Sequence, residues 1–333
     1  MTFHPSEVVR EYAERFPESP AKTLARRIIK DNPRLYRNLE CCYSAVRRVF
    51  GVAGASNRSS QVSSEAKKLR RKPREAGWQA GIPNGLTHHT AWAPYEIEGR
   101  PNVLILSDIH APYHCKKSLT QAIQYGVDAK VNTVILNGDI CDFYAGSKFL
   151  TDPRKRNLIA ELEAVKSILG SIRKALPKAR MIFKKGNHEE RWFRYIATSS
   201  PELLDLAQLS VESLLDMPKY GIECIPDRRP IHVADYTIIH GHELGNMYSN
   251  PVGPARAYWM RTMCNTIAGH LHRTNEYSAL DLNRNLTRVY TAGCLCELRP
   301  DYAPMNGWNN GFIHLVTKKS GKANITNIRN EDL

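Results

Sequence analysis

The stretch NVLILSDIH, residues 102–110, decides the fold of the central part of this 333-residue chain. Its apolar, β-branched run is typical of a buried strand, and a polar loop with Asp108 and His110 follows directly. The same pattern recurs in VNTVILNGDICD (131–142), ARMIFKKGNHE (179–189), YTIIHGH (236–242) and NTIAGHLH (265–272). Because the carboxyl ends of neighbouring strands converge in α/β folds, we expect these five loops to build one site.

The loops carry seven side chains with nitrogen or oxygen donor atoms: Asp108, His110, Asp139, Asn187, His240, His270 and His272. One tetrahedral zinc takes four ligands, so this set suits two divalent ions that share a carboxylate. Metal pairs roughly 3.5 to 4 Å apart clamp a phosphoryl group and activate water at neutral pH. Imidazole, carboxylate and amide ligands without a thiolate favour Mn, Fe or Zn over Ca or copper.

The order and content of these loops resemble the motifs of the calcineurin-like metallophosphoesterases, over roughly residues 100 to 320. The resemblance implies three ligands for each metal and a bridging role for Asp139. The implied ligands of the first metal are Asp108, His110 and His272. Those of the second metal are Asn187, His240 and His270. The implied cofactors are two divalent ions, Mn²⁺ in the first place, with Fe or Zn as alternatives.

The resemblance also implies roles beyond metal binding. His188 matches the family's catalytic histidine, which protonates the leaving oxygen or stabilises its charge, and Asp142 matches the carboxylate that orients this imidazole. Arg191, His242 and Arg256 are candidates to contact the substrate phosphate. The alternative for the two arginines is an ordinary surface position, and for His242 a hydrogen bond that supports the ligands.

Two departures from the pattern of the Ser/Thr protein phosphatases narrow the choice of substrate. The Ser/Thr protein phosphatases of this superfamily read GDxVDRG at the second motif, and their Arg contacts phosphate. This chain reads GDICDFY, so Phe143 stands where that Arg would be. It also has the Gly-His-x-His ending that those phosphatases lack. The chain is therefore more similar to the prokaryotic and viral branch, which includes phosphodiesterases and nucleases.

The pattern of apolar segments predicts the layers of residues 100–333. Helical spacing is found over Lys117–Gln124, Pro153–Leu176 and Pro201–Met217. Strands are expected in NEYSALDL, LTRVYTAG, GFIHLVTK and ANITNI. The resemblance implies an α/β fold of the α+β type, a four-layer αββα sandwich with two mixed sheets between helices.

Residues 1–50 predict a separate small module of three helices, at Ser6–Phe16, Ser19–Asp31 and about Leu39–Phe50. Ser6, and Ser19 with Pro20, suit the starts of the first two helices. The module resembles a helix-turn-helix, whose third helix enters a DNA groove and here carries Arg47 and Arg48. The alternative is a helical appendage for packing or assembly.

Positive charge is concentrated in the first quarter of the chain. Residues 1–80 hold 17 Lys and Arg against 8 Asp and Glu, which is +9 of the total formal charge of +14. Residues 51–99 are expected to be a basic, partly flexible linker. Its run KKLRRKPR could follow a phosphate backbone or could be a solvated charge run. The basic side chains of this run are Lys67, Lys68, Arg70, Arg71, Lys72 and Arg74.

The composition gives an expectation for the cellular location of the protein. Eight cysteines without C-x-x-C spacing are typical of reduced thiols in a cytosolic protein, and Cys294 and Cys296 suggest strand positions rather than a zinc site. No run reaches the roughly 20 apolar residues of a membrane span, so no membrane association is expected. We expect a cytoplasmic protein, in the host cytoplasm if a phage encodes it. The oligomeric state stays open.

These patterns predict a two-metal phosphoesterase, with a phosphodiesterase or nuclease acting on nucleic acid as the first hypothesis. A chain with a net charge of +14 favours a phosphate-rich partner. One alternative is a phosphomonoesterase that acts on a nucleotide or a protein. Another is a DNA-binding or assembly protein with secondary phosphoesterase activity. The metal chemistry is common to all three, so the substrate must be argued from the site.

Overall fold

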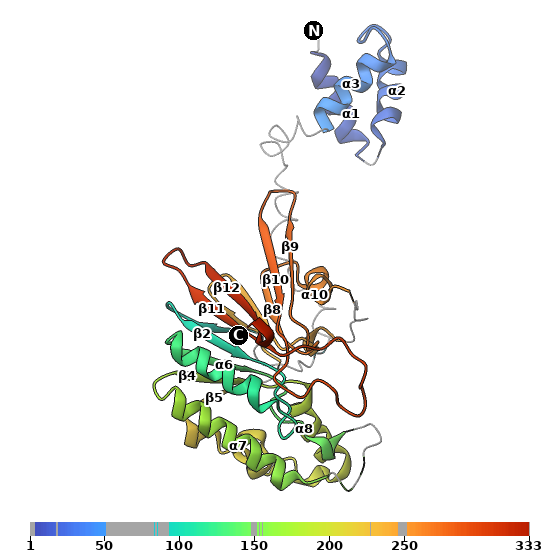
Figure 1. Ribbon diagram of the computed structural model, residues 1–333. Coiled ribbons are helices and arrows are strands. Elements are labelled where there is room, and N and C mark those ends of the chain that lie inside the picture. The colour runs from blue at the N-terminus through green and yellow to red at the C-terminus, as the bar shows by residue number, and fades with distance from the viewer. Residues whose placement is uncertain are drawn as a thin grey trace. The chain divides into compact units, whose positions relative to one another are not determined.

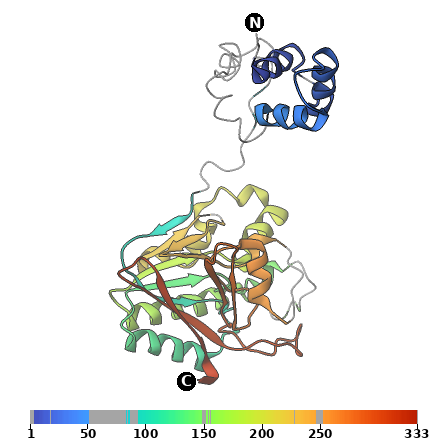
Figure 2. The same ribbon diagram turned by 90° about the horizontal axis from the view of Figure 1, so that it is seen from above.

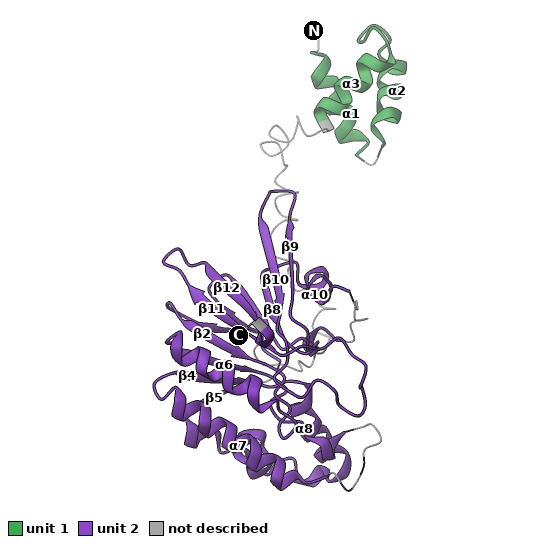
Figure 3. Ribbon diagram, viewed as in Figure 1, with its two compact units in different colours: residues 1–88 green, residues 89–333 purple. Residues whose placement is uncertain are grey.

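The computed structural model describes residues 4–17, 19–50, 83, 85, 93–147, 152, 154, 156–226, 228–245 and 252–332. The chain divides into two compact units, residues 1–88 and 89–333 (Figure 3). Most of the expected linker, including the basic run from Lys67 to Arg74, lies outside the described residues. Within the described part of the chain, no helix combines the length and apolarity needed to cross a membrane.

The first unit contains the three predicted helices, α1 (Pro5–Arg15), α2 (Ala21–Asp31) and α3 (Leu39–Phe50) (Figure 1). They close a small core because each presents an apolar stripe to the other two. Its fully buried side chains come from all three helices and include Val9, Leu24, Ile28 and Val46. The prediction of three helices is confirmed.

Two of the expected helix starts were wrong. The α1 helix begins at Pro5, and its cap is His4, whose Nδ1 accepts a hydrogen bond from the backbone of Ser6. The Glu7 carboxylate accepts from the backbone of His4 in return, so an imidazole here does what a serine hydroxyl was expected to do. The α2 helix begins after Pro20, without a side-chain cap.

The second unit contains two six-stranded sheets. One has the order β12-β11-β2-β3-β4-β5, and the other β1-β6-β7-β8-β10-β9. Figure 1 labels strands of both sheets, and Figure 2 shows the ribbon turned by 90°. The strands of the first sheet are β2 (Asn102–Leu106), β3 (Thr133–Asn137), β4 (Arg180–Lys184), β5 (Ile222–Ile225), β11 (Gly311–Thr317) and β12 (Ala323–Arg329). Those of the second are β1 (Tyr95–Ile97), β6 (Ile231–Val233), β7 (Tyr236–Ile239), β8 (Thr266–Ala268), β9 (Asn275–Leu280) and β10 (Leu286–Thr291). Residues 95–97, expected in the linker, thus belong to a sheet.

The four-layer sandwich is confirmed. Alternate residues of the first sheet face opposite sides, so Leu104 and Leu106 pack under the outer helices while Val103 and Ile105 pack against the second sheet. The outer helices are α6 (Lys116–Asp128), α7 (Leu158–Ala175) and α8 (Asn187–Ser199). On the other side, α10 (Pro254–Thr262) covers the second sheet.

The helix predicted over Pro201–Met217 was wrong. This segment forms the short turns η5 (Pro201–Leu203), η6 (Ala207–Leu209) and α9 (Val211–Leu214), before η7 (Met217–Tyr220). Its helical periodicity is interrupted because Leu206 and Ser210 have extended backbone. The Ser210 hydroxyl then caps α9 by accepting from the backbone of Ser213.

The five strands that precede the polar loops are all present, and their order places the loops together. β2, β3 and β4 are parallel neighbours in the first sheet. β7 and β8 are parallel neighbours in the second. The carboxyl ends of the two groups meet, because His240 at the end of β7 donates from Nδ1 to the carbonyl oxygen of Asn137 at 2.7 Å.

Candidate metal centre and active site

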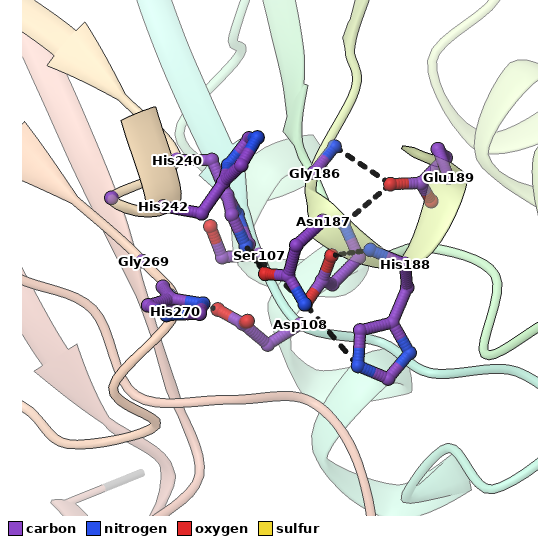
Figure 4. Close-up of polar contacts among 12 residues, drawn as sticks. Ser107, Asp108, Gly186, Asn187, His188, Glu189, His240, His242, Gly269 and His270 are labelled. Atoms are coloured by element: carbon purple, nitrogen blue, oxygen red, sulfur yellow. Dashed lines mark hydrogen bonds and ion pairs between the residues drawn. The ribbon is translucent and has the colours of Figure 1, made fainter. Parts of the chain in front are cut away.

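The structure brings the seven predicted donors together at this edge of the two sheets. Figure 4 labels Asp108, Asn187, His240 and His270 among them. One cluster contains Asp108, His110 and His272. The Nε2 atom of His272 lies 3.2 Å from Asp108 Oδ1 and 3.2 Å from Nε2 of His110. These three side chains are buried, so the cluster faces inward from two sheets.

A second cluster contains Asp139, His240 and His270, with Asn187 beside it. The Nε2 atom of His240 lies 3.3 Å from Asp139 Oδ2 and 3.3 Å from Asn187 Oδ1. Asp139 lies between the clusters, because the same Oδ2 atom is 3.8 Å from His110 Nε2. The carboxylate of Asp139 therefore lies close to both triads.

The chemistry of these atoms fits divalent cations. The Nδ1 proton of His240 is donated to a carbonyl oxygen, so in the neutral ring Nε2 carries a lone pair and faces two oxygen acceptors. His110 donates from Nδ1 to Asp142 Oδ1 at 3.2 Å, so its Nε2 lone pair likewise faces Nε2 of His272. Without a metal, the neighbouring carboxylates favour protons on these imidazoles and raise the pKa of His240 and His272, and a bound cation would take the place of those protons. Asp108 Oδ1 is also buried without a hydrogen-bond partner among the described residues.

The pKa values of the clustered side chains reflect the negative charge of the buried carboxylates. Burial lowers the pKa of His240, but the charge and hydrogen bond of Asp139 outweigh burial and raise it to about 10. Burial and the neighbouring His240 lower the pKa of His270 to about 4. Burial would raise the pKa of Asp139, yet the surrounding imidazoles hold it well below its usual range. The clustered carboxylates thus attract positive charge at this point.

The backbone at the site is held in an uncommon conformation. Positive φ angles occur at Asp108 (55°), His110 (48°), Asp139 (53°), His270 (69°) and His272 (55°). Non-glycine residues rarely adopt this left-handed region, and each instance costs on the order of 1–3 kcal/mol. The surrounding fold therefore supports a strained arrangement that brings five donor side chains inward.

Glycines beside the donors let the loops approach closely. Gly138 has a φ of 85°, and a Cβ atom there would collide with the His240 ring. A Cβ at Gly269 would lie 2.7 Å from Asp108 Oδ2, where the backbone N–H of His270 already donates to the same oxygen at 2.9 Å. A side chain at either glycine would push two donor loops apart.

Glu189 joins two of the loops, a role that could not be predicted from the sequence. Its Oε2 accepts from the backbone N–H groups of Gly186 at 2.7 Å and Asp139 at 2.9 Å. Its Oε1 accepts from Ile140 at 2.8 Å and Cys141 at 3.0 Å. The side chain is buried, and burial and the charge of Asp139 raise its pKa. Its place in GNHE was visible in the sequence, but its four partners were not.

His188 lies beside the two clusters, with its ring 4.3 Å from that of His110 (Figure 4). Its Nδ1 donates to the backbone carbonyl of Asp142 at 2.8 Å, and the carboxylate Oδ1 of Asp142 is 3.2 Å away. Asp142 therefore contacts both His188 and His110. Burial would raise the pKa of Asp142, but hydrogen bonds and charge from these two imidazoles hold it well below its usual range.

Of the three residues predicted to contact the substrate phosphate, Arg191 lies beside His188 in the site. Its Nη2 donates to Nε2 of His188 at 2.7 Å, and its Nη1 donates to the Asp142 carbonyl at 3.3 Å. His188 and Arg191 both lie on α8, one turn apart. The guanidinium thus covers the ring nitrogen of His188 that points away from Asp142.

The other two candidates are placed differently. His242 donates from Nε2 to Glu190 at 2.9 Å, and Glu190 also holds Arg228 through two hydrogen bonds. His242 therefore belongs to a hydrogen-bonded network with Glu190 and Arg228, next to the donor His240. Arg256 is exposed on α10, and the hydrogen bonds described for the site residues do not include it.

The environment of Phe143 accounts for the departure from the phosphatase motif. The ring is fully buried and stacks on Trp192, with centroids 5.7 Å apart. Its backbone N–H donates to the buried carboxylate of Glu161 on α7. This position therefore anchors the loop of Asp142 to the helical layer, and its side chain does not reach the metal-binding clusters.

Cys294 and Cys296 form isolated bridges next to the site rather than a continuous strand. Their thiols and a ring nitrogen of His272 all lie within 4.8 Å of one another, and the buried Nδ1 of His272 has no hydrogen-bond partner among the described residues. Leu295 between them donates its backbone N–H to the Asp108 carbonyl at 3.0 Å. A hydrogen bond from Cys296, followed by the charge of His272, lowers the pKa of Cys294 to about 7. The segment 294–296 thus contacts two of the donor residues, Asp108 and His272.

Comparison with known proteins agrees with this geometry. The family model described as calcineurin-like phosphoesterase matches residues 101–281, and the chain belongs to this family. The Gene 54 protein of Mycobacterium phage D29 is 23% identical over 176 residues, which cover 51% of this chain and 69% of that protein. The Gene 54 protein of Mycobacterium phage L5 is 24% identical over 182 residues, with the same coverage of each chain.

Solved structures with a similar fold are distant in sequence. A dimetal phosphatase from Danio rerio is 12% identical, with a TM-score of 0.36, and the match covers 69% of this chain and 96% of that one. The family and the His and Asp clusters together support a metal-dependent hydrolase that uses divalent ions.

Proposed function

We propose that this protein is a two-metal phosphodiesterase that hydrolyses nucleic acid. The observation that carries the proposal is the shared carboxylate of Asp139 between two triads of buried donors, with His188 and Arg191 beside them. Seven convergent donors and a separate histidine serve no need of a protein that only binds DNA. This favours an active enzyme over a binding or assembly protein.

The proposed ligands follow the two clusters. Asp108, His110 and His272 would hold one ion, and Asn187, His240 and His270 the other, with Asp139 between them. Mn²⁺ is the metal proposed first, and the imidazole, carboxylate and amide donors also suit Fe or Zn. When bound, two such ions neutralise the charge of the phosphate and activate water.

His188 and Arg191 would act on the substrate itself. In the structure, Arg191 donates to His188 Nε2, so this nitrogen is occupied before a substrate arrives. A phosphate oxygen is a better acceptor for a guanidinium, and its arrival would draw Arg191 away and free Nε2. His188, once protonated at Nε2, would donate its proton to the leaving oxygen. Asp142 holds the opposite nitrogen and would stabilise the imidazolium.

The cations at the site support a diester over a monoester. A diester carries one negative charge, whereas a monoester carries close to two at neutral pH. Arg191 offers one guanidinium at His188, while Arg228 is engaged by Glu190. Phe143 is buried where the protein phosphatases of the superfamily have an additional arginine. Among the described residues, the one guanidinium that contacts His188 suits the lower charge of the diester.

The basic amino-terminal region supports a nucleic-acid partner. Of the net charge of +14, residues 1–80 contribute +9, and Arg47 and Arg48 are exposed on α3. A positive region of this kind attracts a polyanion without reading its sequence. The related mycobacteriophage chains support the setting expected from the sequence, the cytoplasm of a bacterial host.

The test is a comparison of substrates. Purified full-length protein with Mn²⁺ is incubated with bis-p-nitrophenyl phosphate, p-nitrophenyl phosphate, and single- and double-stranded DNA. The diester and at least one DNA should be hydrolysed, with the monoester slower. Asp139→Asn, which disturbs both triads, serves as the inactive control. Rapid hydrolysis of the monoester without cleavage of the diester or DNA would replace this proposal by a phosphomonoesterase.

A further inference from the structure

We infer that the exposed face of α2 in the amino-terminal unit is a binding site for the phosphate backbone of nucleic acid. The site is a concave surface that encloses about 450 Å³. Cationic side chains dominate its lining, which includes Arg15, Arg26, Arg27 and Lys30, together with the ring of Phe16. The inference rests on the proposed nucleic-acid function, although the binding itself needs no hydrolysis.

The cations are arranged to meet successive phosphates. Arg26, Arg27 and Lys30 are exposed on one face of α2, and Arg15 reaches the same concavity from the end of α1. Four residues of helix advance about 6 Å along the axis. A DNA strand presents one phosphate about every 3.4 Å of its axis. The helical face therefore spans more than one phosphate group.

Phe16 organises two of the guanidinium groups. The Cζ atom of Arg27 lies 4.1 Å from the centroid of the Phe16 ring, and that of Arg15 lies 5.5 Å from it. A guanidinium that lies against an aromatic ring keeps its N–H donors directed outward and loses less freedom when it binds. The ring thus prepares two bidentate phosphate donors on one surface.

The positive charge of this surface is available to a ligand. No ion pair among the described residues of the helical unit involves any of the four cations. Asp31, which also lines the concavity, accepts a hydrogen bond from Tyr12 at 2.9 Å. In the described lining, four cations face the one carboxylate of Asp31, so the surface keeps a net positive charge that attracts a polyanion.

The surface is polar as well as basic, which argues for nucleic acid over a lipid membrane. Among the side chains described in residues 4–17 and 19–49, no large hydrophobic side chain is exposed. A helix that lies in a membrane interface buries an apolar face in the lipid. On α2 the apolar residues Leu24 and Ile28 are already buried in the helical core. The charged face therefore has no apolar anchor for a lipid surface.

This site differs from the one expected from the resemblance to helix-turn-helix modules. That resemblance would place Arg47 and Arg48 of α3 in a DNA groove. Both are exposed, but they do not line the concavity. They therefore provide a matched control, since a double substitution on either helix removes two positive charges from the same unit.

The experiment compares two full-length double variants, Arg26→Gln with Lys30→Gln, and Arg47→Gln with Arg48→Gln. Binding to a labelled DNA duplex of about 20 base pairs is followed by fluorescence anisotropy, in EDTA, between about 0.05 and 0.2 M salt. The α2 variant should bind roughly 60-fold more weakly at about 0.1 M salt, and its logarithmic salt slope should fall by about 1.8, because each lost phosphate contact contributes about 0.9. The α3 variant should stay within about threefold of the unchanged protein.

Two further measurements complete the test. Circular dichroism shows that both variants retain their helices, and hydrolysis of the small diester with Mn²⁺ shows that the second unit is intact. Phe16→Leu, which keeps an apolar side chain but removes the ring beneath two guanidinium groups, should weaken binding as well. Loss of DNA binding in the α3 variant alone, equal losses in both variants, or binding to anionic vesicles without binding to DNA would overturn the inference. Tight binding to DNA in EDTA, together with no cleavage of that DNA in Mn²⁺, would refute the nuclease proposal and leave this site in place.

Discussion

Replacing Glu189 by Gln tests whether one carboxylate holds the second and third donor loops together. The change keeps the size of the side chain but converts one oxygen into an N–H₂ group, which cannot accept. Whichever oxygen is replaced, two backbone N–H groups lose their acceptor, either those of Gly186 and Asp139 or those of Ile140 and Cys141. Hydrogen bonds to a charged group contribute about 1.5–3 kcal/mol each. The expected loss is therefore about 3–6 kcal/mol, a large part of a typical stability of about 5–15 kcal/mol.

The assay is urea unfolding of the metal-free protein, together with measurement of bound Mn²⁺ after loading. The free energy of unfolding should fall by the stated amount, and Mn²⁺ occupancy should fall because the loops of Asp139 and Asn187 separate. Glu190→Gln on the same helix is the matched control. Its carboxylate accepts from His242 and from Arg228, whose side chain is 49% exposed. A Gln oxygen at the Oε1 position keeps the bonds from His242 and from Arg228 Nε, so this change should cost no more than about 1 kcal/mol. Equal losses in the two variants would refute the role given to Glu189.

Three other predictions follow from the site. Asp139→Asn and His270→Ala should each reduce bound metal and abolish hydrolysis, and full metal occupancy in both, measured by mass spectrometry, would contradict the two-metal assignment. His188→Asn should keep its metal and lose about 100-fold or more in turnover, with a smaller loss for esters that have good leaving groups; an equal loss for all esters would count against proton donation. Burial raises the pKa of Glu161 to about 7 from an ordinary value of 4.5, so its stabilising contribution is present below pH 4.5 and is lost as the pH rises through 7. In EDTA, Glu161→Gln should therefore gain about 3 kcal/mol over the unchanged protein between pH 4.5 and about pH 8, and a difference that does not vary with pH would show that Glu161 is not buried as described.

Much of the donor set could be predicted because it depends on local pattern. Each donor follows a short apolar strand within a few residues, so the strand and its loop are visible together in the sequence. The family motifs then fix which of the neighbouring polar residues to choose. The structure places Asp108 and His272 side by side although 164 residues separate them, and the convergence of strand ends was sufficient to expect this.

The remaining features depend on packing between segments that no local pattern connects. Nothing near Glu161 in the sequence indicates that it accepts from the backbone of Phe143. The contact between Arg191 and His188 depends on rotamers of one helix turn, which the sequence leaves open. The segment Pro201–Met217 has helical spacing, yet extended residues divide it, because apolar periodicity does not record where a chain must turn. In the amino-terminal unit, charge alone could not show that the concave basic face lies on α2.

The division of the donor residues between two sheets has a consequence for the synthesis of this protein in a cell. Asp108, His110, Asp139 and Asn187 follow strands of one sheet, while His240, His270 and His272 follow strands of the other. A ribosome must therefore complete the chain to at least residue 272 before the last donor exists. The two sheets must then pack together before the donors meet. A metal-dependent hydrolase whose donors are divided in this way stays inactive as a nascent chain until both sheets have formed and packed together.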